Sequence, residues 1–300
     1  MVHLVLILVQ ALMASLAIVG KLVMREIPPG VLILARVCGA AAVLAVAHRA
    51  LRLEPVRDRA DLRSLALMGL LGVAANQSLF LLGLRHTTAV NATILVTMVP
   101  VFTVLGSLLF RRESPSAPKV VGILLAGSAA VYLIGPDRVS LAPGLALGNA
   151  MIVVAMMAYA AYLVTVRQML NRYSAITVSY YVMLFGALGV LPAGLYGLHS
   201  MGPVHAKTWL LVGYIVLFPT ILAYFLNIWA LKRASSNLVA VFTYLQPVFT
   251  AAVAPLLLEG EKVTPRAAIA ALGIFTGLAL VIWGERRERG EVPVASMVGE

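Results

Sequence analysis

Long apolar stretches recur along the whole chain, and short polar segments separate them. Because a transmembrane helix needs about 20 apolar residues, this pattern predicts ten membrane-spanning helices. The predicted spans are Leu4–Gly20, Gly30–Ala47, Leu65–Leu84, Thr88–Phe110, Pro118–Ile134, Leu145–Val166, Thr177–Leu198, Trp209–Leu231, Leu238–Leu258 and Pro265–Trp283. Stretches of this length do not match the alternating strands of membrane barrels, and lipid offers no partner for an unpaired backbone group. We therefore expect an all-α integral membrane fold.

The composition agrees with a membrane protein. The chain is 61% hydrophobic and only 12% charged, whereas about a quarter of the residues in soluble domains carry a charge. The excess apolar surface must face lipid. The net charge of +11 does not indicate nucleic-acid binding, because the cations form short clusters between apolar stretches, as membrane topology requires. The single cysteine, Cys38, excludes an internal disulfide bond.

The distribution of lysine and arginine predicts which ends of the helices face the cytoplasm. If the N-terminus is cytoplasmic, the even-numbered connections and the C-terminal tail hold 15 of these cations, and the odd-numbered connections hold 7. The densest cluster, in the second connection, consists of Arg49, Arg52, Arg57, Arg59 and Arg63. Because positive charge collects on the cytoplasmic side, we expect a multi-pass protein of the cell inner (plasma) membrane with both termini in the cytoplasm.

The two halves of the sequence are predicted to be copies of each other. The tetrapeptide PVFT occurs at Pro100–Thr103 and again at Pro247–Thr250, and a glutamate follows each copy, at Glu113 and at Glu261. Each proline is expected to kink its helix, because it frees a carbonyl near the middle. The expected units are repeat 1 at residues 1–138, repeat 2 at residues 139–285 and a cytoplasmic tail at residues 286–300. Five helices per copy make the repeat inverted, an arrangement found in many secondary transporters.

Charged residues are rare in the predicted spans. All 12 acidic residues lie outside them. Since a buried carboxylate is the usual proton or cation relay, this argues against coupling through an acid inside a span. Arg36 is the one strong charge in the interior of a predicted span. Two interpretations of Arg36 stay open. In the first its role is structural, and the side chain bonds to carbonyl groups or extends to the membrane surface; in the second it contacts an anionic group of a substrate.

Neutral polar and aromatic residues mark a candidate binding site. Gln77 and Phe80 share one face of the third predicted helix, and Tyr224 and Asn227 occupy the equivalent positions of the eighth. Equivalent helices of an inverted repeat face each other where substrates bind. The expected substrate-binding residues are Asn76, Gln77, Phe80, Thr97, Tyr159, Tyr224, Asn227 and Tyr244. For any one of them, hydrogen bonding between helices is an equally good explanation.

These features resemble the EamA-type members of the drug/metabolite transporter superfamily. The segment LGLRHTTAVNATILVTMVPVFTVLGSLLFRRE carries the resemblance, ALKRASSNLVAVFTYLQPVFTAAVAPLLLEGE repeats it, and Arg36 in LARVCGAAAVL matches an arginine common in the second helix of the family. The resemblance covers nearly the whole chain. It implies a secondary transporter or facilitator that moves amino acids or related small metabolites, by alternating access through a central cavity.

Other functions were weighed against this one. A sugar-phosphate or nucleotide-sugar exchanger is the alternative among transporters, but several buried cations would be expected for it. A membrane receptor or scaffold is the alternative from another class. The sequence has no HExxH and no phosphate-binding GxxxxGK[ST] loop, so we expect no enzyme activity, no cofactor and no metal. The expected partners are a small-molecule substrate and the lipid bilayer, with the oligomeric state left open.

Overall fold

The computed structural model describes residues 1–87, 95–110, 116–134, 142–249, 252 and 265–288, and every regular element in these ranges is helical. The α-helices are α1 (Val2–Val23), α2 (Pro29–Ala50), α3 (Arg59–Gly69), α4 (Asn76–Arg85), α6 (Val99–Leu109), α7 (Ala117–Ile134), α8 (Ala146–Arg172), α9 (Ala175–Leu198), α10 (Ala206–Ile215), α11 (Ala223–Leu231), α12 (Ser236–Val241) and α14 (Pro265–Glu288). Two π-helical segments, Leu70–Ala75 and Val216–Leu222, join α3 to α4 and α10 to α11. Residues 59–85 and 206–231 are therefore two continuous helical rods.

Several helices begin at residues that satisfy their first free amide groups. The side chain of Asp58 accepts a hydrogen bond from the backbone N–H of Ala60 at the start of α3. Ser174 and Ser235 do the same for the first turns of α9 and α12, and α2 opens with Pro29, whose missing N–H is not needed there. Such N-caps matter because the first four N–H groups of a helix have no partner within it.

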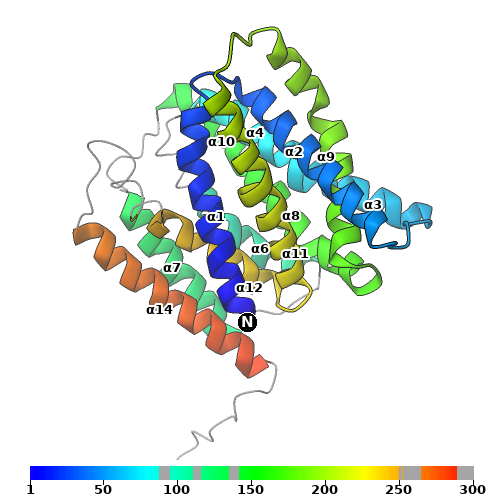
Figure 1. Ribbon diagram of the computed structural model, residues 1–300. Helices are drawn as coiled ribbons and strands as arrows, with labels where there is room; N and C mark the ends of the chain where they lie inside the picture. The colour runs from blue at the N-terminus through cyan, green and yellow to red at the C-terminus, as the bar shows by residue number, and fades with distance from the viewer. Residues whose placement is uncertain (88–94, 111–115, 135–141, 250–251, 253–264, 289–300) are drawn as a thin grey trace, which may run out of the picture.

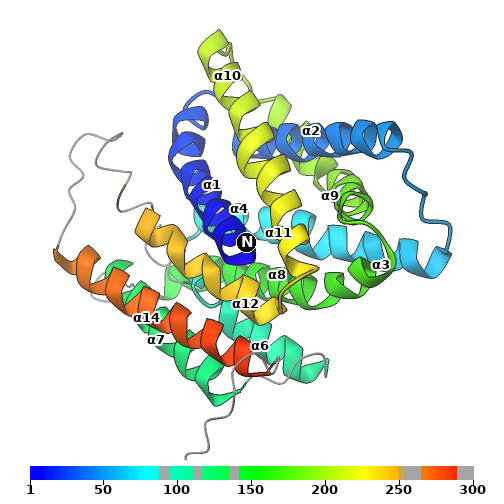
Figure 2. The same ribbon diagram turned by 60° about the horizontal axis from the view of Figure 1, so that its bottom comes forward.

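The helices pack as two outer pairs around a central group. α7 lies beside α14, α2 lies beside α9, and α1, α8, α11 and α12 lie between the two pairs (Figures 1 and 2). Within the described ranges, five helical stretches are long and apolar enough to cross a membrane, namely 29–50, 146–172, 175–198, 206–231 and 268–288, and shorter apolar helices accompany them. Many leucines and other large apolar side chains are exposed on the outer faces of these helices, as expected of a surface that meets lipid rather than water.

Glycines bring both outer pairs into close contact. In the α7–α14 pair, a Cβ atom added at Gly122 would lie 2.5 Å from the carbonyl oxygen of Gly277. In the α2–α9 pair, a Cβ atom added at Gly30 would lie 2.7 Å from the carbonyl oxygen of Ala193. Small residues allow helix backbones to approach this closely, and dispersion contacts then hold helices together in lipid, where the hydrophobic effect does not.

The predicted spans and the described helices coincide closely in position. The first predicted span, Leu4–Gly20, becomes the longer α1, and most of the others differ from their helices by only a few residues. Residues 88–94 of the fourth span and most of residues 250–258 of the ninth lie outside the described residues. Pro100 occupies the first turn of α6 after a turn at residues 97–98, and Pro247 follows the 3₁₀ segment Phe242–Tyr244. Each proline thus stands just after an interruption of helical structure.

The α7–α14 contact gives a first prediction. Replacing Gly122 with valine should force the two backbones apart, and overpacking of this kind costs about 1–3 kcal/mol. The thermal unfolding temperature of the purified protein in detergent should fall. Gly213→Ala is the matched control, because no atom lies within 4 Å of a Cβ atom there and alanine favours a helix more than glycine does. Equal unfolding temperatures for Gly122→Val and the unchanged protein would contradict the close packing.

Candidate functional site

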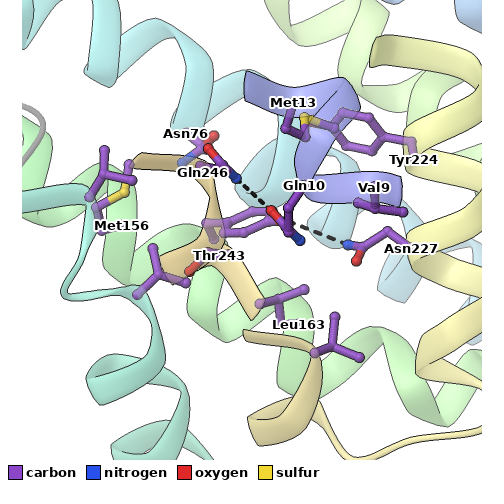
Figure 3. Close-up of a pocket in the computed structure, with 14 residues that line it drawn as sticks. Val9, Gln10, Met13, Asn76, Met156, Leu163, Tyr224, Asn227, Thr243 and Gln246 are labelled. Carbon is purple, nitrogen blue, oxygen red and sulfur yellow. Dashed lines mark hydrogen bonds between the residues drawn. The ribbon is translucent and has the colours of Figure 1, made fainter. Parts of the chain in front are cut away.

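A cavity of about 150 Å³ lies among the central helices. Figure 3 shows its lining, in which side chains from α1, α8, α11 and α12 converge. The polar lining residues are Gln10, Asn76, Tyr159, Tyr224, Asn227, Thr243 and Gln246. The other lining residues are four valines, one leucine and two methionines. Among the residues that the structure describes, the lining thus contains four side-chain amides and three hydroxyl groups but no charged side chain.

The amides of the cavity hydrogen-bond to groups on other helices. The Nε2 atom of Gln246 donates to Oε1 of Gln10 across 2.7 Å, which joins the ninth predicted span to the first helix. The Nδ2 atom of Asn76 donates to the carbonyl oxygen of Ala155 on α8 at 3.0 Å. Asn227 donates to the hydroxyl oxygen of Tyr159 at 3.5 Å, the long limit of such a contact. The cavity wall is therefore held together by hydrogen bonds between helices. When a solute enters, the same amide and hydroxyl groups can exchange these partners for polar groups of the solute.

The two π-helical segments position the polar residues of the third and eighth predicted spans. Leu70–Ala75 ends directly before Asn76, and Val216–Leu222 ends two residues before Tyr224. A π turn inserts an extra residue per turn, which rotates the side chains that follow it, and such segments are frequent at functional sites. The Nε2 atom of Gln77 lies 3.4 Å from the hydroxyl oxygen of Tyr224. Two positions that the sequence predicts to be equivalent thus meet directly.

The structure brings together about half of the residues expected at the site. Asn76, Tyr159, Tyr224 and Asn227 line the cavity, and Gln77 contacts it through Tyr224. The three remaining residues lie outside the lining. Phe80 packs against the hydrophobic core, Thr97 is buried, and the hydroxyl of Tyr244 points towards Gly127 on α7.

Three polar lining residues were absent from the expected set. Gln246 and Thr243 belong to the segment around Pro247, where a 3₁₀ turn changes the direction of successive side chains. Gln10 is the third, and its partner Gln246 is 236 positions away in the sequence. One signal for Gln10 was available, because it is the only amide in the first predicted span.

Arg36 lies behind the cavity wall. It is buried, it does not line the cavity, and its Nε atom donates to the hydroxyl oxygen of Thr220 in the second π-helical segment at 3.0 Å. A carboxylate partner for Arg36 is not found among the described residues. The cation therefore contacts the second π-helical segment, which leads into the cavity helix α11, and not the cavity itself.

Glu285, expected outside the spans, lies in a helix that is long and apolar enough to cross a membrane. α14 continues to Glu288, and the stretch 268–288 that is long enough to cross a membrane includes Glu285, which is 7% exposed. The carboxylate is tolerated there because Lys119 lies 2.6 Å away, and Lys119 is itself buried. Asp61 is likewise buried, in α3, where Arg172 and Tyr173 contact it. The argument against coupling through an acid therefore loses its premise.

Comparison with known proteins decides the family. The chain matches the EamA-like transporter family over residues 1–135 and 146–283. It belongs to this family. The resemblance seen in the sequence is thereby confirmed. EamA-family relatives are transporters and not enzymes, so the chain is a multi-pass membrane transporter.

Individual relatives of this EamA-family chain cover most of its length. The probable terminal-alkyne amino-acid exporter of Streptantibioticus cattleyicolor is 30% identical, over 89% of this chain and 87% of its own. The uncharacterized transporter YetK of Bacillus subtilis is 27% identical, over 83% of this chain and 77% of its own. A crystal structure of another protein superposes with a TM-score of 0.80 at 21% identity, covering 96% of this chain and 98% of that one. This last similarity concerns the fold alone.

The direction of neighbouring side chains at the 3₁₀ segment gives a second prediction. Thr243 lines the cavity, whereas Tyr244 is 1% exposed and packs towards α7. In a Cys38→Ser background, Thr243→Cys should react with N-ethylmaleimide about tenfold faster than Tyr244→Cys, because buried thiols are inert. The measurement is the rate of labelling of the purified protein in detergent. A faster reaction at position 244 would place the cavity on the other side of this segment.

Proposed function

We propose that this EamA-family protein exports amino acids or related small metabolites, with no net charge, by alternating access through the central cavity. The observation that carries the proposal is the lining, which offers amide and hydroxyl groups but no charged side chain among the described residues. Such groups can both donate to a carboxylate and accept from an ammonium group, so they suit a zwitterion. The neutral valines and methionines suit an apolar side chain.

The size of the cavity limits the solute. A cavity of about 150 Å³ is as large as an engineered apolar cavity that binds benzene. In this conformation the site therefore fits an amino acid with a small side chain and not a nucleotide sugar. A phosphate group would call for several cations, but no described lysine or arginine lines the cavity, and Arg36 contacts Thr220 outside the lining. Export as the direction is suggested by the amino-acid exporter of S. cattleyicolor at 30% identity.

The proposal includes ten spans arranged as two inverted five-helix repeats, residues 1–138 and 139–285. Three observations support it. The π-helical segments Leu70–Ala75 and Val216–Leu222 occupy equivalent places in the two halves. The neighbouring pairs of helices are equivalent too, because α4 lies beside α8 as α11 lies beside α1. The family match, finally, divides into residues 1–135 and 146–283. Inversion would give the two related conformations that alternating access needs.

Contacts between connections support the proposed distribution of the connections over two membrane faces. The orientation in that proposal, with both termini cytoplasmic in a plasma membrane, rests on the charge count. Asp61, after the second connection, contacts Arg172 and Tyr173 at the sixth. Glu26 of the first connection contacts His205 of the seventh, where the backbone N–H of His205 lowers the pKa of the Glu26 carboxyl. Each contact joins connections that the proposed topology assigns to the same membrane face.

A labelling experiment tests the topology. In a Cys38→Ser background, Lys207→Cys and Lys232→Cys introduce exposed thiols into the seventh and eighth connections. Because the even connections carry the excess of positive charge, an impermeant maleimide should label position 207 in intact cells and position 232 only after lysis. Labelling in the opposite pattern would show the reverse orientation. Labelling of both positions in intact cells would show that the helix between them does not cross the membrane.

Flux through reconstituted vesicles tests the function itself. Vesicles loaded with radiolabelled alanine, serine, tryptophan or glucose 6-phosphate should release the small amino acids and retain the sugar phosphate. Gln10→Ala and Asn227→Ala each remove an amide from the cavity, and losing one buried hydrogen bond costs about 1–3 kcal/mol, or about five- to a hundredfold in affinity. The KM for alanine should rise accordingly.

Cys38→Ala is the control for these variants, because Cys38 does not line the cavity. Its KM should equal that of the unchanged protein. Specific binding of alanine without any flux would indicate a receptor. Flux of glucose 6-phosphate alone would indicate the phosphate exchanger, and unchanged KM values in both amide variants would move the site elsewhere.

A further inference from the structure

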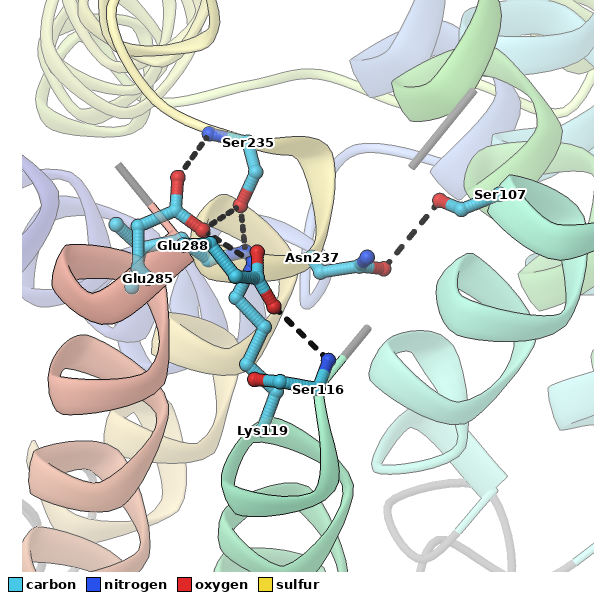
Figure 4. A network of polar contacts seen from close by, with 8 residues as sticks. Ser107, Ser116, Lys119, Ser235, Asn237, Glu285 and Glu288 are labelled. Atoms are coloured by element: carbon cyan, nitrogen blue, oxygen red, sulfur yellow. Dashed lines mark hydrogen bonds and ion pairs between the residues drawn. The ribbon is translucent and has the colours of Figure 1, made fainter. Parts of the chain in front are cut away.

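A buried cluster of charges fastens three helices together at the molecular face that holds the N-terminus (Figure 4). Lys119, in the first turn of α7, lies 2.6 Å from Oε2 of Glu285 near the end of α14. The Lys119 side chain is 2% exposed and the Glu285 side chain 9%. Lys119 also contacts Glu288, whose other carboxylate oxygen accepts a hydrogen bond from the backbone N–H of Ser116. This part of the cluster ties α7 to α14.

Glu285 extends the cluster to α12. Its Oε1 atom accepts a hydrogen bond from the backbone N–H of Ser235 at 3.1 Å, and its Oε2 atom accepts one from the Ser235 hydroxyl at 2.7 Å. Ser235 is the N-cap of α12, and its side-chain oxygen accepts in turn from the backbone N–H of Leu238. One carboxylate therefore holds both a lysine on α7 and the first turn of α12.

The helix held in this way forms part of the cavity wall. Val239, Thr243 and Gln246 all line the cavity. At about 1.5 Å per residue, Val239 is roughly one helical turn from Ser235. A displacement of Ser235 away from α14 must therefore carry the cavity wall with it. The cluster lies between the cavity and the face that holds the N-terminus.

The opposite face has a much weaker ion pair. There Glu26 contacts His205, and these side chains are 29% and 83% exposed. Exposed pairs contribute little to stability, because water screens them. Buried ion pairs, by contrast, seldom exceed a hydrophobic contact in stability, but they are directional and break as a unit. Exchange of ion pairs at an interface is a common feature of transitions between two conformations. Among the residues that the structure describes, the ion pair at this opposite face is thus exposed, whereas the pair of Lys119 and Glu285 is buried.

We propose that Lys119, Glu285 and Ser235 form a latch, which closes the cavity towards the face that holds the N-terminus. Opening on this side separates Ser235 from Glu285 and moves the first turn of α12 away from α7 and α14. The latch residues are positioning residues, since they do not line the cavity. The inference rests on the proposed function in one respect, because it takes the cavity to be the site that opens to each membrane face in turn.

Accessibility of a cavity thiol tests the latch without any substrate. Val239→Cys is introduced in a Cys38→Ser background, and membrane vesicles receive a charged, impermeant methanethiosulfonate reagent on the latch face. Lys232→Cys is a separate reference variant, whose thiol is exposed near Ser235. Its reaction shows that the vesicles present the latch face to the reagent. Adding Glu285→Gln should make Val239→Cys react about tenfold faster, because the labelling rate follows the population of the open conformation.

Two further variants make the result decisive. Glu26→Gln removes a carboxylate at the opposite face, so it should leave the labelling rate unchanged. Lys119→Met combined with Glu285→Met removes the latch without leaving an unpaired buried charge, and it should accelerate labelling as Glu285→Gln does. Each protein is first checked for monodisperse elution in detergent. If the double variant elutes normally and labels at the unchanged rate, the cluster only stabilises the fold and the latch is wrong, whatever the vesicle flux shows.

Discussion

The lack of hydrogen-bond partners in lipid is the constraint on which the rest of this structure depends. Helices satisfy the backbone and the hydroxyl groups that bond to the preceding turn, but an amide side chain needs a partner elsewhere or an enclosed polar space. In this chain, Gln10 meets Gln246, Asn76 meets a backbone carbonyl of α8, and Gln77 meets Tyr224. Polar groups are thus gathered around one cavity, and the same groups that join the helices are available to a solute. Packing and recognition use one set of residues.

Charge is kept away from this cavity and used at its borders. Arg36 contacts Thr220 outside the cavity lining, and the buried pair of Lys119 and Glu285 lies at the start of α12. An unpaired charge in the cavity would bind a single counterion strongly and release it slowly. Neutral amides bind more weakly and exchange partners easily, which a transport site requires. Ion pairs at the border supply instead the directional contacts that distinguish one conformation from another.

Much of the fold could be predicted from the sequence, because hydropathy marks the apolar helices. The repeat identified Tyr224 and Asn227 as cavity residues and the contact of Gln77 with Tyr224. Other site residues depend on local departures from the α-helix. The π-helical and 3₁₀ segments rotate the side chains near them, so ordinary helical periodicity could not show that Thr243 faces the cavity and Tyr244 does not. The sequence places Glu285 outside the predicted spans, because its burial depends on Lys119, which lies 166 positions earlier.

The most direct test of alternating access is whether one cavity residue can be reached from both faces of the membrane. Met156 lines the cavity on α8, and Met156→Cys in a Cys38→Ser background provides a single thiol there. An impermeant reagent applied to intact cells and, separately, to inverted membrane vesicles should label this thiol in both, and alanine should slow both reactions. Labelling from one face alone, in the presence and the absence of alanine, would contradict the account.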